Sequence, residues 1–111
     1  MNNAVSFRGV SGEAHGFKQV DVDSAWAGTG GVALFAAPDA FGWRIIRIVE
    51  ISGRIHDARP IWAFADAQRY GATTVFVCAE RDAYTRSHIM ADLDAGLTPV
   101  CTVDTGLAIA A

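Results

Sequence analysis

The sequence predicts an α+β fold in which two helices flank a small, mainly antiparallel sheet of three strands. A hairpin pattern over residues 32–51, followed by two helical segments with a third strand between them, predicts this β-β-α-β-α order. The length of 111 residues and the hydrophobic content of 51% suit one core, because single domains commonly run to about 100–150 residues. We therefore expect a single domain over residues 1–111, with its core at about 31–103 and a tail over 104–111.

The first thirty residues are expected to form an N-terminal arm or short strands. Two short apolar runs, residues 5–10 and 17–22, lie between turns that contain glycine. Runs of this length between glycine turns are typical of short strands. We place this segment outside the predicted core.

A β-hairpin is predicted next, with strands over residues 32–37 and 43–51. Pro38, Asp39 and Gly42 supply the turn chemistry between them. The second strand carries isoleucine or valine at positions 45, 46, 48, 49 and 51, so both of its faces are largely apolar. Because such a strand is typical of a sheet interior, we expect it to be the central strand.

The first helix is predicted over residues 58–70. Asp57 is expected to cap it, Pro60 fits its first turn, and Gly71 fits the position just past its end. Its apolar stripe is expected to consist of Ile61, Phe64, Ala65 and Gln68 or Ala67.

The second helix is predicted after a third strand over residues 73–79. Asp82 is expected to be its N-cap and Gly96 its end. Its apolar side is expected to consist of Ile89, Met90 and Leu93. Residues 97–103 are then expected to leave in extended form past Pro99.

Charge and hydropathy restrict the partners of this chain. A net charge of −3 and a pI near 5.4 disfavour nucleic acid, although five arginines stand against three acidic residues between positions 44 and 69. The apolar stretches fall far short of the roughly 20 residues that span a bilayer. We expect a cytoplasmic protein without a membrane partner, and we leave its natural partner, self-association included, open.

The candidate ligand-binding residues lie on and just after the second hairpin strand. Guanidinium groups match phosphate and carboxylate in bidentate geometry, so arginines presented on one strand face favour an anionic ligand. The candidate set consists of Arg44, Arg47, Arg54, Arg59 and Trp43. The competing interpretation is that these arginines form ion pairs with Glu50 or Asp57.

Cysteines and histidines give no catalytic or metal site. Cys78 and Cys101 have no histidine at ligand spacing, and a zinc site wants four nitrogen or sulfur donors. We expect both thiols to be reduced, Cys78 to belong to the core, and His15 and His88 to lie on the surface. No catalytic residue, metal or cofactor is assigned on this basis.

Several short segments in this order carry a resemblance to a known family. Gly31-Val32-Ala33 opens the first hairpin strand, and Arg47-Ile48-Val49 lies in the second. Residues 70–75 lead out of the first helix, residues 86–93 read Arg-Ser-His-Ile-Met-Ala-Asp-Leu, and residues 97–102 read Leu-Thr-Pro-Val-Cys-Thr. Together with the order of elements, these segments resemble the GIY-YIG nuclease family over about residues 7–102.

The resemblance implies a nuclease scaffold whose catalytic positions are replaced. In the family, tyrosines position the nucleophilic water, an arginine steadies the phosphate, and a glutamate holds a divalent metal. By this resemblance, Ala33 and Arg47 stand at the tyrosine positions and Met90 at the glutamate position, where a thioether cannot replace a hard oxygen ligand. Arg54 or Arg59 matches the arginine, and Thr102 replaces an asparagine.

Our leading interpretation is a non-catalytic binding or protein-interaction domain on a GIY-YIG-like scaffold. One alternative is a divergent metal-dependent DNA endonuclease of the PD-(D/E)XK kind that uses Asp39 and Glu50, although Ser52 stands where its lysine belongs. A second alternative is a small-anion or nucleotide-binding module that uses the arginines between positions 44 and 59.

Overall fold

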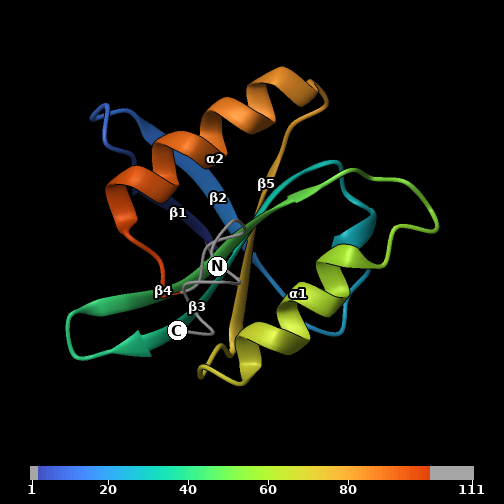
Figure 1. Cartoon of the computed structure of the whole chain (residues 1–111). Coiled ribbons are helices and arrows are strands. Elements are labelled where there is room, and N and C mark those ends of the chain that lie inside the picture. The colour runs from blue at the N-terminus through green and yellow to red at the C-terminus, as the bar shows by residue number, and fades with distance from the viewer. Residues whose placement is uncertain (1–2, 101–111) are drawn as a thin grey trace, which may run out of the picture.

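A computed structural model describes residues 3–100 and contains a five-stranded antiparallel sheet with two α-helices (Figure 1). Its elements are β1 (Ala4–Arg8), β2 (Ala14–Val20), the 3-10 helix η1 (Trp26–Gly28), β3 (Gly31–Asp39), β4 (Gly42–Ile51), α1 (Arg59–Gln68), β5 (Thr74–Ala79) and α2 (Ala83–Leu97). The predicted α+β class and the hairpin are confirmed. No helix in the described range is long and apolar enough to cross a membrane.

The sheet is larger than predicted, because the first thirty residues belong to it. Its strand order is β1-β2-β5-β3-β4, and β2 joins through an antiparallel pairing that runs from Lys18 opposite Val77 to Val20 opposite Val75. Phe7 of β1 and Phe17 of β2 are buried in the core. The short strands that were one of the two expectations for this segment are therefore confirmed, whereas its place outside the core and the three-stranded sheet were wrong.

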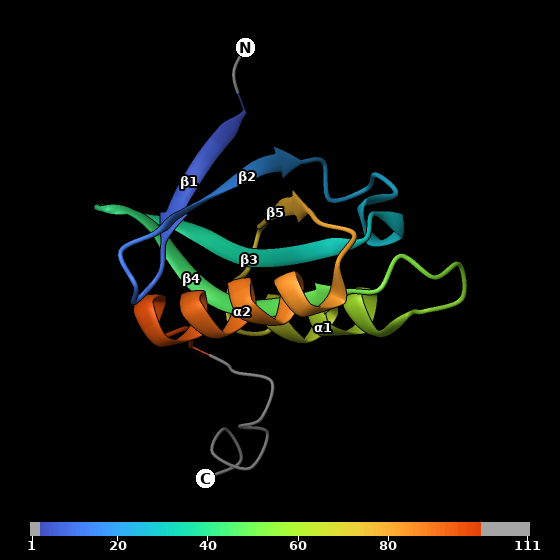
Figure 2. The same cartoon turned by 90° about the horizontal axis from the view of Figure 1, so that it is seen from above.

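Strand β4 lies at the edge of the sheet, so the expectation that it is central was also wrong. Its two apolar faces have another cause, since α1 covers one face and α2 the other. Ile46 and Val49 belong to the core on the α1 side, whereas Ile45 and Ile48 belong to the core on the α2 side. Figure 2 shows both helices running alongside β4.

Each helix closes a separate aromatic core on its own face of the sheet. On the α1 side, the ring centroid of Phe35 lies 5.0 Å from that of Phe64 and 5.5 Å from that of Trp26. On the α2 side, Phe76 packs edge-on against Phe7 at 5.2 Å and against Trp43 at 4.9 Å. Such aromatic pairs contribute beyond the area they bury. The pair of Phe35 and Phe64 holds α1 on the sheet, whereas α2 joins its core through the aliphatic side chains of Ile89 and Leu93.

The start of α1 differs in detail from the prediction. The helix begins at Arg59 with Ala58 as its N-cap, and Asp57 accepts a hydrogen bond from the backbone N–H of Arg59 at 3.1 Å without itself being the cap. Its buried residues are Pro60, Ala63, Phe64 and Ala67. The predicted stripe is confirmed at Phe64 and at Ala67, which was offered as the alternative to Gln68, and it was wrong at the exposed Ile61 and Ala65. Gly71 has the positive φ, 100°, expected after a helix end.

Helix α2 is capped as predicted but ends later. The Asp82 side chain accepts a hydrogen bond from the backbone N–H of Thr85 at 2.9 Å. The helix continues through Gly96 and ends where Thr98 adopts the left-handed conformation at φ 46°. Gly96 serves close packing instead, since a Cβ there would lie 2.5 Å from the backbone nitrogen of Val10. Residues 101–103 of the predicted extended exit, and the tail, lie outside the described residues.

Gly31 is the glycine on which the β3–β5 pairing most directly depends. A Cβ at this position would lie 2.0 Å from the backbone oxygen of Cys78, whereas a Cβ at Gly28 would meet nothing within 4 Å. We predict that Gly31→Ala lowers the free energy of unfolding by roughly 3 kcal/mol or more, because backbone must shift to admit the methyl group. Gly28→Ala should change it by less than about 0.5 kcal/mol. Urea denaturation of both variants tests this, and equal stability of the two would contradict the pairing.

Candidate functional site

Two of the predicted ligand residues lie near the turn of the β3–β4 hairpin, away from the others. Arg44 donates a hydrogen bond from Nη2 to the backbone oxygen of Tyr70 at 2.9 Å, just beyond the end of α1. Trp43 packs against Phe76 in the core on the α2 side. Arg44 and Trp43 therefore hold the hairpin against the rest of the molecule.

Arg47 and Arg59 lie farther along β4 and α1, and each is already paired with a carboxylate. Arg47 Nη1 lies 3.3 Å from Asp66 Oδ2, while Arg59 donates to Asp57 through Nε and Nη2, both at 2.8 Å. The Arg59 guanidinium, and then the Ser52 hydroxyl, hold the pKa of Asp57 well below its usual value. Asp57 in turn raises the pKa of Arg59.

The remaining predicted arginine, Arg54, is exposed in the loop between β4 and α1. The structure thus does not bring the five predicted ligand residues into one cluster. The ion pair between Arg59 and Asp57 was one of the pairs expected under the competing interpretation.

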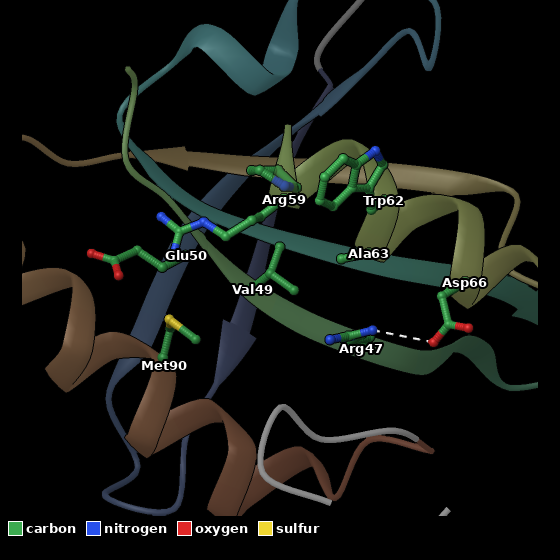
Figure 3. Close-up of a pocket in the computed structure, with 9 residues that line it drawn as sticks. Arg47, Val49, Glu50, Arg59, Trp62, Ala63, Asp66 and Met90 are labelled. Carbon is green, nitrogen blue, oxygen red and sulfur yellow. Dashed lines mark hydrogen bonds and ion pairs between the residues drawn. The ribbon is translucent and has the colours of Figure 1, made fainter. Parts of the chain in front are cut away.

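Arg47 and Arg59 do line one common feature, a hollow of about 480 Å³ along β4 (Figure 3). Strand β4 forms its floor, α1 forms one wall with Trp62 and Ala63, and Met90 of α2 stands on the other side. Its lining residues are Arg47, Val49, Glu50, Arg59, Pro60, Trp62, Ala63, Asp66 and Met90. Trp62 is 69% exposed, so much of its side chain is open to solvent beside the hollow.

The hollow also collects three of the six residues named for the family resemblance, Arg54 and Arg59 being alternatives for one position. Arg47, Arg59 and Met90 line it, whereas Ala33 is fully buried within β3. Arg54 lies outside it, and Thr102 is beyond the described residues.

Asp39 and Glu50, the carboxylates of the nuclease alternative, lie at opposite ends of the hairpin. Asp39 is paired with Gly42 at the turn, and Glu50 is paired with Val32, about 23 Å away along β3 at about 3.3 Å per residue. Asp39 accepts the backbone N–H of Phe41 at 2.8 Å. These two carboxylates are too far apart to hold one metal ion.

Glu50 is bound instead by Arg86, a residue that sequence reasoning treated only as part of a family motif. Arg86 is buried, donates from Nε to Glu50 Oε2 at 2.8 Å, and donates from Nη1 to the backbone oxygens of Glu80 and Arg81. It therefore ties the first turn of α2 to β4 and to the loop after β5. Its spacing of three residues from Ile89 was the available signal, because it places Arg86 on the buried side of the helix.

On its outer edge, β4 presents backbone N–H and C=O groups that form no hydrogen bond with β3. The carbonyls of Gly30 and Ala36 accept N–H groups from the β5 side of the sheet at 2.8 and 3.0 Å. In an antiparallel strand, the N–H and C=O groups of successive residues point to opposite neighbours, so those of the even-numbered residues of β3 point toward β5. Val32 and Leu34 of β3 are paired with Glu50 and Ile48 of β4. The N–H and C=O groups of Glu50 and Ile48 therefore point away from β3, beside the hollow.

A single described contact covers part of this edge. The backbone N–H of Val100 donates to the carbonyl of Ile45 at 3.1 Å, at the point where the chain leaves α2. Within residues 3–100, no backbone hydrogen bond reaches the outward groups of Ile48 and Glu50. Among the described residues, the part of this edge without a backbone partner therefore coincides with the hollow.

A second cluster holds the β1–β2 hairpin on α2. His15 is buried, so the expectation that it lies on the surface was wrong, and its Nε2 lies 2.8 Å from Asp92 Oδ2. The Asp92 carboxylate also accepts the backbone N–H and the hydroxyl of Ser11, at 2.9 and 2.8 Å. Glu13 completes a group of ligand-type atoms within 4.8 Å of one another. Because both Asp92 oxygens already accept hydrogen bonds within the chain, this cluster serves as a structural clamp.

Cys78 lies partly exposed at the end of β5, so the expectation of a core position holds only in part. Burial, with a contribution from Glu80, raises the pKa of its thiol. A raised pKa lowers the thiolate fraction at neutral pH, so Cys78 is a poor nucleophile.

Comparison of the chain with protein-family models, with curated proteins and with solved structures finds no match. Function is therefore argued from the geometry of the site.

The clamp at Asp92 predicts a specific pH dependence of stability. The His15 hydrogen bond, followed by those from Ser11, lowers the pKa of Asp92 to about 2. Since this is below the unfolded value of about 3.9, the contribution is present above pH ~4 and is lost as the pH falls toward 2. We predict that Asp92→Asn is less stable than the natural chain at neutral pH and that the difference narrows below pH ~4.

Urea denaturation at a series of pH values measures that difference. Asp23→Asn, in an exposed turn, is the control and should follow the natural chain throughout. A gap between Asp92→Asn and the natural chain that stays constant down to pH ~2 would contradict the clamp.

Proposed function

We propose that this chain is a non-catalytic protein-interaction domain that binds an extended peptide as an additional strand on β4. The observation that carries this proposal is the coincidence of the outward backbone groups of Ile48 and Glu50 with the hollow between α1 and α2. An unpaired strand edge is a template for another strand, and many peptide-binding domains use one in this way.

The walls of the hollow suit an extended peptide. Successive side chains of a strand point to opposite faces, so a strand added beside β4 turns alternate residues toward α1 and toward α2. It meets Trp62 and Ala63 on the first side and Met90 on the second. Backbone hydrogen bonds to β4 then supply affinity, and these apolar walls select the side chains.

The two helices favour a single strand over a second folded copy. Neighbouring strands lie about 4.8 Å apart, whereas a helix with its side chains is about 10 Å wide. A second copy pairing through its own β4 would bring its own α1 and α2 into the same space. An extended peptide has no helices that would collide with α1 and α2.

The charged groups of the hollow support binding over catalysis. Arg47 is paired with Asp66, Arg59 with Asp57, and Glu50 with Arg86. Acid–base or nucleophilic chemistry needs a group that is available to a substrate. Among the described residues of the hollow, each ionisable side chain is paired with another lining residue, with Asp57 of the neighbouring loop or with Arg86 of α2.

A GIY-YIG-like scaffold stays part of this proposal. Three positions of the resemblance, Arg47, Arg59 and Met90, come from three different elements and gather in the hollow. This gathering supports a scaffold whose former reaction site now serves binding. The anion-binding alternative is favoured by the buried Nε of Arg47, which has no hydrogen-bond partner among residues 3–100, but an anion would compete with Asp66 and Asp57.

The test compares two variants at Glu50, whose backbone N–H points outward. Glu50→Pro removes that donor without removing a bond to β3, and Glu50→Ala keeps the donor while losing the ion pair with Arg86. Decapeptides selected from a random displayed library on the immobilised chain are then titrated against both variants. We predict at least about tenfold weaker binding to Glu50→Pro, and a change within about threefold for Glu50→Ala.

Peptides that bind the two variants equally would contradict strand addition on β4. Circular dichroism of both variants serves as the control that the fold is retained.

A further inference from the structure

We infer that the peptide partner carries an acidic side chain that Arg47 binds, two positions along the strand from an apolar side chain that lies beside Trp62 and Ala63. This inference rests on the proposed function, because it names the chemistry of the partner that occupies the same hollow.

A β-bulge in β4 turns the Arg47 side chain toward α1. The register between β3 and β4 shifts at Ile46, which is left without a partner residue on β3. Successive side chains of a regular strand point to opposite faces. Here Ile46 belongs to the core on the α1 side, and the next residue, Arg47, also contacts α1 through Asp66. Bulges often re-aim a side chain next to active sites, and this one brings an arginine to the lining of the hollow.

Arg47 keeps most of its hydrogen-bonding capacity for a ligand. A guanidinium has five N–H donors. Among residues 3–100, the Arg47 side chain makes one hydrogen bond, from Nη1 to Asp66 Oδ2 at 3.3 Å, and its buried Nε has no acceptor. Arg59, the other arginine of the hollow, is held by Asp57 through two contacts of 2.8 Å. Arg47 is therefore the arginine of the hollow that is better placed to bind an anionic group.

Asp66 is a replaceable partner for Arg47. Its side chain is 44% exposed, so water can solvate it when Arg47 turns to another carboxylate, and ion pairs this exposed contribute little to stability. A carboxylate can accept two parallel N–H bonds from one guanidinium, whereas Asp66 accepts one. An acidic side chain on a strand that is already bonded to β4 also acts at a high effective concentration, which a free anion lacks. A peptide carboxylate can therefore displace Asp66 where a small anion does not.

The spacing of side chains on β4 sets the spacing expected in the peptide. Arg47 and Val49 both line the hollow from β4, and their pairing with β3 is regular (Figure 3). Residues directly opposite each other on neighbouring strands share one face of the sheet. A peptide residue opposite Val49 then meets Trp62 and Ala63, and the residue two positions away, opposite Arg47, meets the guanidinium. The expected motif is an apolar and an acidic residue separated by one residue, in either direction along the peptide.

Selection of random displayed decapeptides on the immobilised chain tests this inference. We expect peptides retained by the natural chain to carry Asp or Glu two positions from an apolar residue, and Arg47→Gln to lose this preference. Arg54→Gln removes the same charge from the exposed loop outside the hollow. It is the matched control and should keep the preference.

Titration of a selected peptide then measures the coupling between its acidic residue and Arg47. Replacing that residue by its amide should weaken binding to the natural chain by at least about fivefold, and to Arg47→Gln by less than about twofold. Asp66→Asn removes the competing carboxylate, so the acidic peptide should bind this variant at least about threefold more tightly than the natural chain. This gain is measured on a chain that retains Arg47.

Three outcomes would overturn the inference. The first is a set of selected peptides without a preference for acidic residues. The second is an amide replacement that costs the same affinity on the natural chain and on Arg47→Gln. The third is binding of the acidic peptide to Asp66→Asn that is unchanged or weaker.

Glu50→Pro separates this inference from the proposed function. Peptides that Glu50→Pro weakens, but that bind the natural chain and Arg47→Gln equally, overturn the inference alone. Peptides whose acidic residue depends on Arg47, but that bind Glu50→Pro and the natural chain equally, leave Arg47 as the acid-binding residue and overturn strand addition on β4.

Discussion

Strand β4 is enclosed by helices on both faces and by β3 on one edge, and the arrangement of the site depends on that constraint. Ile46 and Val49 must meet α1 while Ile45 and Ile48 meet α2, so both helices are drawn to the same strand. Within residues 3–100 the outward backbone groups of Ile48 and Glu50 on the remaining edge have no partner. The hollow between the two helices lies along this edge.

Charged side chains stabilise this arrangement by pairing across its elements. Arg86 ties α2 to Glu50, and Arg47 connects β4 to Asp66 of α1. On the far side, Asp92 holds the β1–β2 hairpin against α2 through Ser11 and His15. The first two contacts tie both helices to β4, on either side of the hollow.

Local signals in the sequence predicted the elements that local physics determines. Proline, aspartate and glycine between two apolar runs identified the hairpin, and Asp82 identified the start of α2. The sheet order could not be predicted in this way, because the pairing of β2 with β5 joins residues that are far apart in the chain. For the same reason the burial of His15 was missed, since its partner Asp92 lies 77 positions away. The apolar residues on both faces of β4 correctly indicated that both faces are buried. They did not show that β4 lies at the edge of the sheet.

The candidate site was predicted in part. The arginine-rich stretch and Met90 pointed to the region of the hollow, but charge pattern alone did not show that Arg47 and Arg59 are paired or that Arg44 serves the hairpin. The open edge was invisible to sequence reasoning, because a strand with two apolar faces is expected inside a sheet.

The most direct test of the central claim is an isotope-edited nuclear Overhauser measurement on the full chain, with and without a selected peptide. The account predicts cross-strand contacts from the amide protons of Ile48 and Glu50 to α-protons of the bound peptide. Contacts from these two amides only to neighbouring residues of β4 and to water, with peptide bound, would contradict it.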